Sequence, residues 1–228
     1  YSTTRREKDI PVFKKGITEA AGKQQDARDR RYISTDGTAI TAVLKNEDIR
    51  SGDYEKFWNI PRPGHADLTA ALKYGNGSPE GVASGGGRFS GRMTAPLCIA
   101  GGICKQLLAK EGIEVISRIY SIKDIEDQGE LTESTAAKSF PTVNEEQGDK
   151  MIALIKECKS KGDSVGGVVE CLCRGIPAGL GGPLFEGMES RISEIVFGIP
   201  AVKGIEFGAG FKAAQLTGSE NNDAFRYK

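Results

Sequence analysis

A glycine-rich run that carries two arginines and leads into an apolar helical pattern constrains the fold of this chain most strongly. The run is Gly85-Gly86-Gly87-Arg88-Phe89-Ser90-Gly91-Arg92, and residues with helical spacing follow it from position 94 to position 111. The apolar stripe of that pattern consists of Leu97, Ala100, Cys104 and Leu107. A helix that is apolar on most sides is typically buried, so the sequence predicts a rigid, buried central helix at 94–111.

The same run predicts an anion site, with phosphate as the expected anion, at the start of the helix. Glycine has no side chain to block a close approach, and a helix N-terminus offers unpaired N–H groups and the positive end of a dipole. Arg88 and Arg92 add cations, which a purely flexible loop does not call for. The GxGxxG and GxxxxGK[ST] spacings are absent from this run, so a standard dinucleotide site or P-loop is not expected. A plain flexible loop is the alternative interpretation.

The only histidine, His65, lies in the sequence Arg62-Pro63-Gly64-His65-Ala66-Asp67. The Pro-Gly pair predicts a turn and argues against a packed strand position for the histidine. An imidazole can accept or donate a proton near neutral pH, so His65 is a candidate acid–base group beside the anion site. A purely structural histidine is the alternative.

Both stretches resemble segments of the chorismate synthase family, and other segments do so in family order along nearly the whole chain. The matching stretches are residues 1–9, 45–54, 62–67, 73–75, 85–92, 94–96, 162–167, 175–185, 199–211 and 218–223. Ordered segments are far more specific than one short motif, and they argue against an unrelated anion-binding module that shares only the glycine run. The sequence is therefore identified as a member of this family.

The resemblance implies an α+β fold, with helices sandwiched between antiparallel sheets, and a cytoplasmic homotetramer. It also implies a carbon–oxygen lyase that acts on a small molecule in the last step of the shikimate pathway. The reaction is the 1,4-anti elimination of phosphate from 5-enolpyruvylshikimate 3-phosphate, which gives chorismate. The family requires reduced FMN although the reaction has no net redox change.

The resemblance also assigns roles to individual residues. His65 matches a catalytic histidine thought to protonate the reduced flavin, and Arg62, Ser90 and Arg92 match substrate-binding residues. The residues that match FMN-binding positions are Arg88, Phe89, Ser90, Pro200 and Ala201. Two of these depart from the family, because Phe89 stands where many relatives have serine and Pro200 stands where asparagine is common.

Composition excludes several other classes of protein. Basic and acidic residues balance at 31 each, which argues against nucleic-acid or membrane-surface binding. No apolar run is long enough to span a bilayer. The five cysteines have no CxxC spacing, so we expect reduced thiols that fill core space and no metal site. The cysteines are Cys98, Cys104, Cys158, Cys171 and Cys173.

The chain begins with Tyr1, whereas family members carry further functional motifs in segments at both ends. We therefore expect residues 1–228 to be a single domain from the centre of a longer chorismate synthase chain. The alternative to an active lyase is an incomplete fragment that folds and oligomerises without turnover. Residues 10–31 diverge from the family and are rich in charge, which predicts a solvated surface excursion or a frayed helix.

Periodicity predicts the remaining elements, and their order indicates an α+β chain. Helices are expected at 144–162, capped by Asn144 and Gly162, and at 185–197. Strands are expected at 40–44, 115–120, 168–174, 202–207 and 211–216.

Overall fold

A computed structural model describes residues 10–19, 33–45, 60–75 and 84–225 of the chain. Contacts divide the chain into two compact units. Unit 1 comprises residues 1–100 and 185–228, and unit 2 comprises residues 101–184. The described elements are helices and antiparallel strand pairs, so the predicted α+β class is confirmed.

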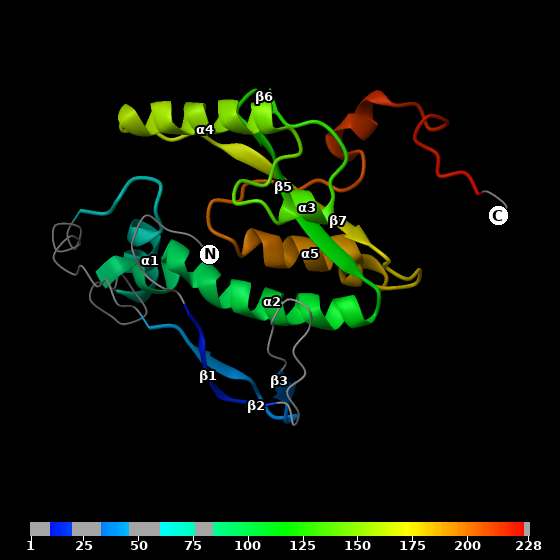
Figure 1. Cartoon of the computed structure of the whole chain (residues 1–228). Coiled ribbons are helices and arrows are strands. Elements are labelled where there is room, and N and C mark those ends of the chain that lie inside the picture. The colour runs from blue at the N-terminus through cyan, green and yellow to red at the C-terminus, as the bar shows by residue number, and fades with distance from the viewer. Residues whose placement is uncertain (1–9, 20–32, 46–59, 76–83, 226–228) are drawn as a thin grey trace. The chain divides into compact units, whose positions relative to one another are not determined.

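Unit 2 is built on a sheet of strand order β6-β5-β7 (Figure 1). The long central strand β5 (Glu114–Ile122) pairs antiparallel with β7 (Gly167–Arg174) and with the short β6 (Ile125–Glu126). Helix α3 (Glu133–Ala136) contacts β5, and helix α4 (Glu145–Ser160) contacts β6. The strands predicted at 115–120 and 168–174 are therefore confirmed.

Helix α4 begins and ends where its sequence predicts. The Asn144 side chain accepts a hydrogen bond from the Gln147 backbone N–H at 3.2 Å, which caps the first turn. Gly162, just beyond the helix, has a φ of +70°, the left-handed conformation that glycine adopts without strain. Met151 on the apolar stripe is fully buried, so α4 contributes to the core of unit 2.

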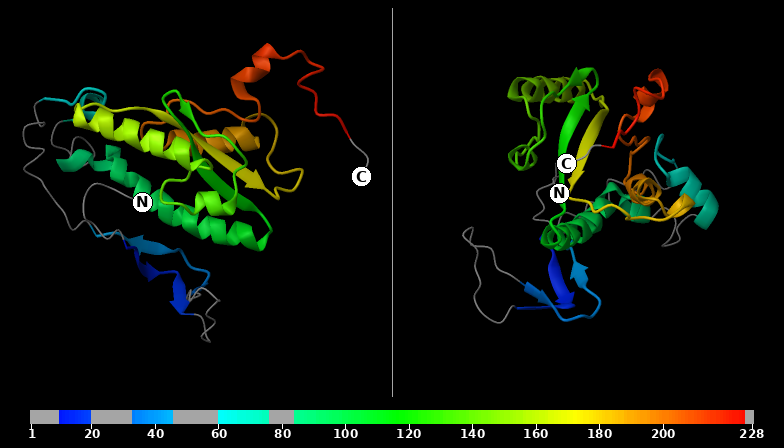
Figure 2. Two further views of the ribbon diagram at one scale, coloured as in Figure 1. Left: turned by 45° about the horizontal axis from the view of Figure 1, so that its top comes forward. Right: turned by 90° about the vertical axis from the view of Figure 1, so that its right-hand side faces the viewer.

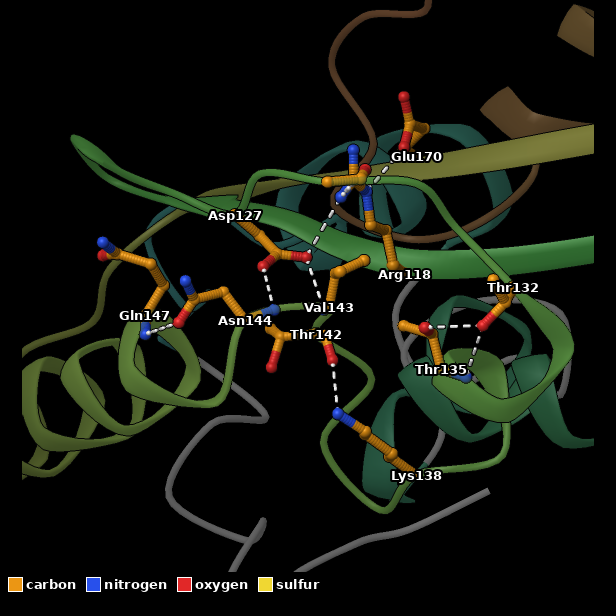
Figure 3. Close-up of polar contacts among 11 residues, drawn as sticks. Arg118, Asp127, Thr132, Thr135, Lys138, Thr142, Val143, Asn144, Gln147 and Glu170 are labelled. Atoms are coloured by element: carbon orange, nitrogen blue, oxygen red, sulfur yellow. Dashed lines mark hydrogen bonds and ion pairs between the residues drawn. The ribbon is translucent and has the colours of Figure 1, made fainter.

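A buried charged cluster connects the sheet of unit 2 to the start of α4 (Figure 3). Asp127 accepts hydrogen bonds from the backbone N–H groups of Val143 at 2.7 Å and Asn144 at 2.9 Å. Arg118 Nη1 donates to the same carboxylate at 3.2 Å, and its Nε donates to Glu170 at 2.6 Å. Strands β5 and β7, the loop after β6 and the entry to α4 are thereby joined through one arginine–carboxylate network.

The described start of unit 1 consists of two antiparallel strand pairs (Figure 2). Strand β1 (Val12–Lys15) pairs with β4 (Thr41–Val43), and β2 (Ile17–Glu19) pairs with β3 (Ile33–Thr35). Gly16 separates β1 from β2 at a φ of +82°, and a Cβ there would lie 2.6 Å from Ile40 Cα. The strand predicted at 40–44 is confirmed. In the described part of 10–31, residues 12–15 and 17–19 are strands, so the frayed-helix alternative is wrong there. Positions 20–31 of the charged run lie outside the described residues.

Helix α2 (Thr94–Lys110) confirms the helix predicted at 94–111, but the prediction that it is buried is wrong for this chain. Ala95 is its buried residue, whereas Leu97 is 44% exposed and Leu107 is 55% exposed. Helical periodicity shows which side chains gain free energy from burial, but not whether other parts of the same chain cover them. Leu97 and Leu107 of the predicted apolar stripe are therefore exposed in the described structure.

Two predicted strands are wrong. Residues 211–216 lie mainly in a 3₁₀ helix, η5 (Gly210–Gln215), and residues 202–207 join no sheet. Gly208 and Gly210 have positive φ values of 58° and 55°, which interrupt an extended backbone. Alternating apolar residues form a strand only where a partner strand pairs with them.

The helix predicted at 185–197 forms as a shorter helix, α5 (Met188–Phe197), preceded by the 3₁₀ turn η4 (Leu184–Glu186).

The expectation that the cysteines fill core space is also wrong for this chain. Cys158 is half-buried, and the remaining thiols are exposed. None of the described helices has the length and apolarity needed to cross a membrane.

Candidate active site

The turn that carries His65 is shaped by its Pro-Gly pair. Gly64 has a φ of +70°, and the His65 backbone N–H donates to the Arg62 carbonyl oxygen at 3.3 Å. Helix α1 (Asp67–Tyr74) begins two residues after the histidine. This tight reversal places the side chains at positions 62, 65 and 67 against one another.

The carboxylate of Asp67 is the centre of this cluster. Its Oδ2 accepts hydrogen bonds from the Arg62 backbone N–H at 3.1 Å and from Arg62 Nε at 2.7 Å. Its Oδ1 accepts from Arg62 Nη2 at 3.0 Å and lies 2.6 Å from His65 Nδ1. One aspartate therefore fixes both the guanidinium and the imidazole.

Burial differs sharply between the carboxylate and its partners. The Asp67 side chain is 3% exposed, whereas Arg62 is 26% exposed and His65 is 27% exposed. The hydrogen bonds from Arg62 hold the pKa of the Asp67 carboxyl well below its usual range, although burial alone would raise this pKa. The cluster thus presents an arginine and a histidine to solvent, and it keeps the carboxylate charged beneath them.

The glycine-rich run forms ordered 3₁₀ turns that lead into α2. The turns are η2 (Ser84–Phe89) and η3 (Gly91–Met93). Ser90 caps η3, because its Oγ accepts the backbone N–H of Arg92 at 3.3 Å. Arg88 is exposed at the end of η2, so a cation and a hydroxyl-bearing residue stand just before the helix, as the sequence predicts.

Phe89 connects this run to the His65 region. The centroid of its ring lies 6.3 Å from that of Tyr74, the last residue of α1. This separation is typical of an aromatic pair. The helix that Asp67 begins therefore ends beside the glycine-rich run.

Pro200 and Ala201 lie in the turn that follows α5, and both are exposed. Ala201 has a φ of +71°, an uncommon conformation for a residue that carries a Cβ. Such residues cluster at functional sites, where the surrounding structure holds them in place.

The predicted site residues thus fall into three groups. Arg62 and His65 form one group, residues 88–92 form the second, and Pro200 with Ala201 forms the third. Their convergence around one cleft stays a prediction.

Sequence reasoning missed both α1 and the role of Asp67. The available signal was a carboxylate two residues after the histidine, followed by apolar residues at helical spacing.

Comparison with known proteins decides which family carries this arrangement. The family model described as chorismate synthase matches residues 1–228. The chain belongs to the chorismate synthase family. A chorismate synthase of Lancefieldella parvula is 40% identical over all of this chain and 61% of that protein's length. One of Korarchaeum cryptofilum is 43% identical over 84% of this chain and 54% of that protein.

A crystal structure of chorismate synthase supports the assignment at the level of the fold. It matches 69% of this chain with a TM-score of 0.61 and 28% sequence identity, and the match covers 51% of that structure. The chain thus spans between half and about three fifths of the length of these chorismate synthases.

Proposed function

We propose that the protein is a carbon–oxygen lyase that converts 5-enolpyruvylshikimate 3-phosphate to chorismate. In this 1,4-anti elimination a C–O bond and a C–H bond break, the C=C bond between them shifts so that two conjugated C=C bonds result, and inorganic phosphate and a proton are released. The observation that carries the proposal is the family match over residues 1–228, which includes the turn that exposes His65 beside Arg62. Both units belong, in this proposal, to one chorismate synthase domain.

Arginine side chains bind the substrate in this proposal. The substrate carries carboxylate and phosphate groups, and the planar guanidinium of arginine can bind either with two parallel hydrogen bonds. Arg62 and Arg92 take this role, and Ser90 adds a hydroxyl. The support is that Arg62 is partly exposed and held in place by Asp67, while Ser90 and Arg92 are ordered by the cap of η3.

The residues before α2 have the chemistry that FMN requires. Arg88 offers a cation for the phosphate, Ser90 offers a hydroxyl, and the partly exposed ring of Phe89 can contact the planar flavin. Pro200 and Ala201 would contribute backbone groups at a turn where Ala201 has a φ of +71°. Reduced FMN, when bound, supplies electron density as the phosphate departs. His65 would donate a proton to the reduced flavin from a ring nitrogen.

We further propose that the enzyme is a cytoplasmic homotetramer. Exposed apolar side chains on α2, including Leu97 and Leu107, support contacts between copies of the chain. Free thiols throughout the sequence support a reducing compartment. Sedimentation velocity of the complete translation product should give a tetramer, and a monomer would contradict this part of the proposal.

The activity test is an anaerobic assay of the 228-residue chain and of the complete translation product of its gene. Each is given reduced FMN and 5-enolpyruvylshikimate 3-phosphate, and chorismate and free phosphate are measured together. Stoichiometric formation of both products is expected from the complete translation product. Absence of both products from that protein, with FMN bound, would refute the proposed function.

Arg92→Ala tests the substrate contacts separately. We expect a higher KM with an unchanged fold, because an anionic group of the substrate loses its cation. The loss in kcat/KM should be about tenfold to a hundredfold, which is typical of a charged hydrogen bond. Unchanged kinetics would remove Arg92 from the site.

A further inference from the structure

We propose that Asp67 is a positioning residue that fixes His65 in the tautomer with its proton on Nδ1. This assignment leaves the lone pair on Nε2, which lies 3.3 Å from Arg62 Nη2, as the place where the ring exchanges a proton. The same carboxylate holds the Arg62 guanidinium, so one buried side chain orients two exposed functional groups. The part of this proposal that concerns catalysis rests on the proposed function, whereas the tautomer itself does not.

The tautomer follows from the contact between Asp67 and His65. Oδ1 of Asp67 lies 2.6 Å from Nδ1 of His65, which is a hydrogen-bonding distance. An ionised carboxylate can only accept hydrogen bonds, so Nδ1 must carry the proton. A neutral imidazole has one N–H, which leaves Nε2 with the lone pair. The aspartate of a serine-protease triad fixes its histidine in the same way.

The role of Asp67 is to orient its neighbours rather than to touch the substrate. Its side chain is 3% exposed, and its oxygens accept from three groups of Arg62 as well as lying against the imidazole. Arg62 and His65 retain about nine times that exposure, at 26% and 27%. A ligand can therefore reach the arginine and the histidine while the carboxylate stays beneath them.

Replacement of Asp67 by asparagine makes a specific prediction because the two carboxylate oxygens differ in their partners. Oδ1 faces His65 Nδ1 and accepts one group of Arg62, Nη2. Oδ2 accepts two Arg62 groups, the backbone N–H and Nε, neither of which can become an acceptor. The amide oxygen of asparagine should therefore take the Oδ2 position, and the amide NH₂ should face His65. That NH₂ donates, so the hydrogen bond from Arg62 Nη2 to Oδ1 is lost, Nδ1 becomes an acceptor and the ring proton moves to Nε2.

Nitrogen-15 NMR of the histidine ring tests this directly. His65 is the only histidine in the 228 residues, and a His65→Gln spectrum removes any ambiguity in the complete translation product. Spectra are recorded at about pH 9, where an ordinary imidazole is neutral. The wild-type ring should be protonated on Nδ1, and Asp67→Asn should shift the majority to the Nε2–H form.

Two outcomes would overturn the proposal. One is a wild-type ring protonated mainly on Nε2, which decides the question even if the variant does not fold. The other is a folded Asp67→Asn protein whose ring keeps the wild-type tautomer.

The catalytic arm uses the same variant in the complete translation product. Asp67→Asn should lower kcat by about tenfold to a hundredfold, which is part of the roughly 10²–10⁴-fold contribution of a positioned acid–base group. Asp149→Asn, which removes an exposed carboxylate on α4, is the matched control and should leave kcat unchanged. A folded Asp67→Asn enzyme with wild-type kcat would contradict the positioning role. A wild-type protein without lyase activity would reject the proposed function and leave the NMR result to decide the tautomer.

Discussion

Asp67 in unit 1 and Asp127 in unit 2 are both buried carboxylates that accept hydrogen bonds from an arginine and from the backbone. The partners of Asp67 lie within five residues of it in the sequence, and they are partly exposed. The partners of Asp127 lie nine to seventeen residues away, and its arginine is only 7% exposed. An arginine–aspartate pair therefore stabilises a local turn in unit 1, whereas in unit 2 such a pair joins segments that are distant in the sequence.

The difference teaches how burial of the arginine separates a binding role from a structural one. Arg118 gives its hydrogen bonds to Asp127, Glu170 and a backbone carbonyl inside unit 2. Arg62 keeps 26% of its side chain exposed, next to an imidazole. We therefore expect changes at the Asp127 cluster to affect stability, and changes at the Asp67 cluster to affect function first.

The largest expected effect is loss of activity in His65→Gln. Removal of a positioned acid–base group should lower kcat by about 10²–10⁴-fold. Stability should change little, because the ring is partly exposed. The assay uses the complete translation product, with Thr69→Ala on α1 as a nearby exposed control. If His65→Gln kept the wild-type kcat, the Asp67 cluster, like the Asp127 cluster, would have only a structural role.

The next effect is on stability. Asp127→Ala should lower the free energy of unfolding by about 3–5 kcal/mol, because it leaves Arg118 and two backbone N–H groups with a lost acceptor. Urea unfolding followed by circular dichroism measures this change. Glu170→Gln is the control, and it should cost much less because Glu170 is 43% exposed. A loss below about 1 kcal/mol for Asp127→Ala would contradict a junction role.

Acid should weaken the Asp67 cluster in a defined direction. Asp67→Asn should cost about 1–3 kcal/mol of stability at neutral pH, as expected for hydrogen bonds to a charged group. The folded pKa of Asp67 is depressed, so its contribution is complete above the unfolded carboxyl pKa of about 4 and is lost as pH falls below it. The difference in unfolding free energy between wild type and variant should therefore shrink below about pH 4. A difference that stays constant down to about pH 2 would show that the charge of Asp67 does not stabilise the turn.

The smallest effect concerns the cap of α4, next to the Asp127 cluster. Asn144→Ala removes the side-chain acceptor of the Gln147 N–H and should cost about 1 kcal/mol. Asn144→Ser keeps an oxygen at the cap and should recover most of the loss. Thermal unfolding of both variants measures the difference. Equal stability of the two variants would mean that the Asn144 side chain does not stabilise the start of α4. Asp127, which accepts the Asn144 backbone N–H, would then be the residue that stabilises it.

Several features that depend on residues close in the sequence were predicted correctly, although the short helix α1 was missed. The helix at 94–111, the capped helix at 144–162 and the strand at 168–174 form as expected. A cap, a glycine in the left-handed conformation and an apolar period all act within a few residues, so they can be read from the chain.

The sequence by itself determined the family, the turn around His65 and the positions of helices α2 and α4 and strands β4, β5 and β7. Only the tertiary structure decided that Asp67 is buried beneath Arg62 and His65, and that α2 keeps its apolar stripe exposed. It also decided that residues 202–216 form no strand. The physical reason is shared: burial and strand pairing depend on groups brought in from elsewhere, and periodicity along the chain does not specify those partners.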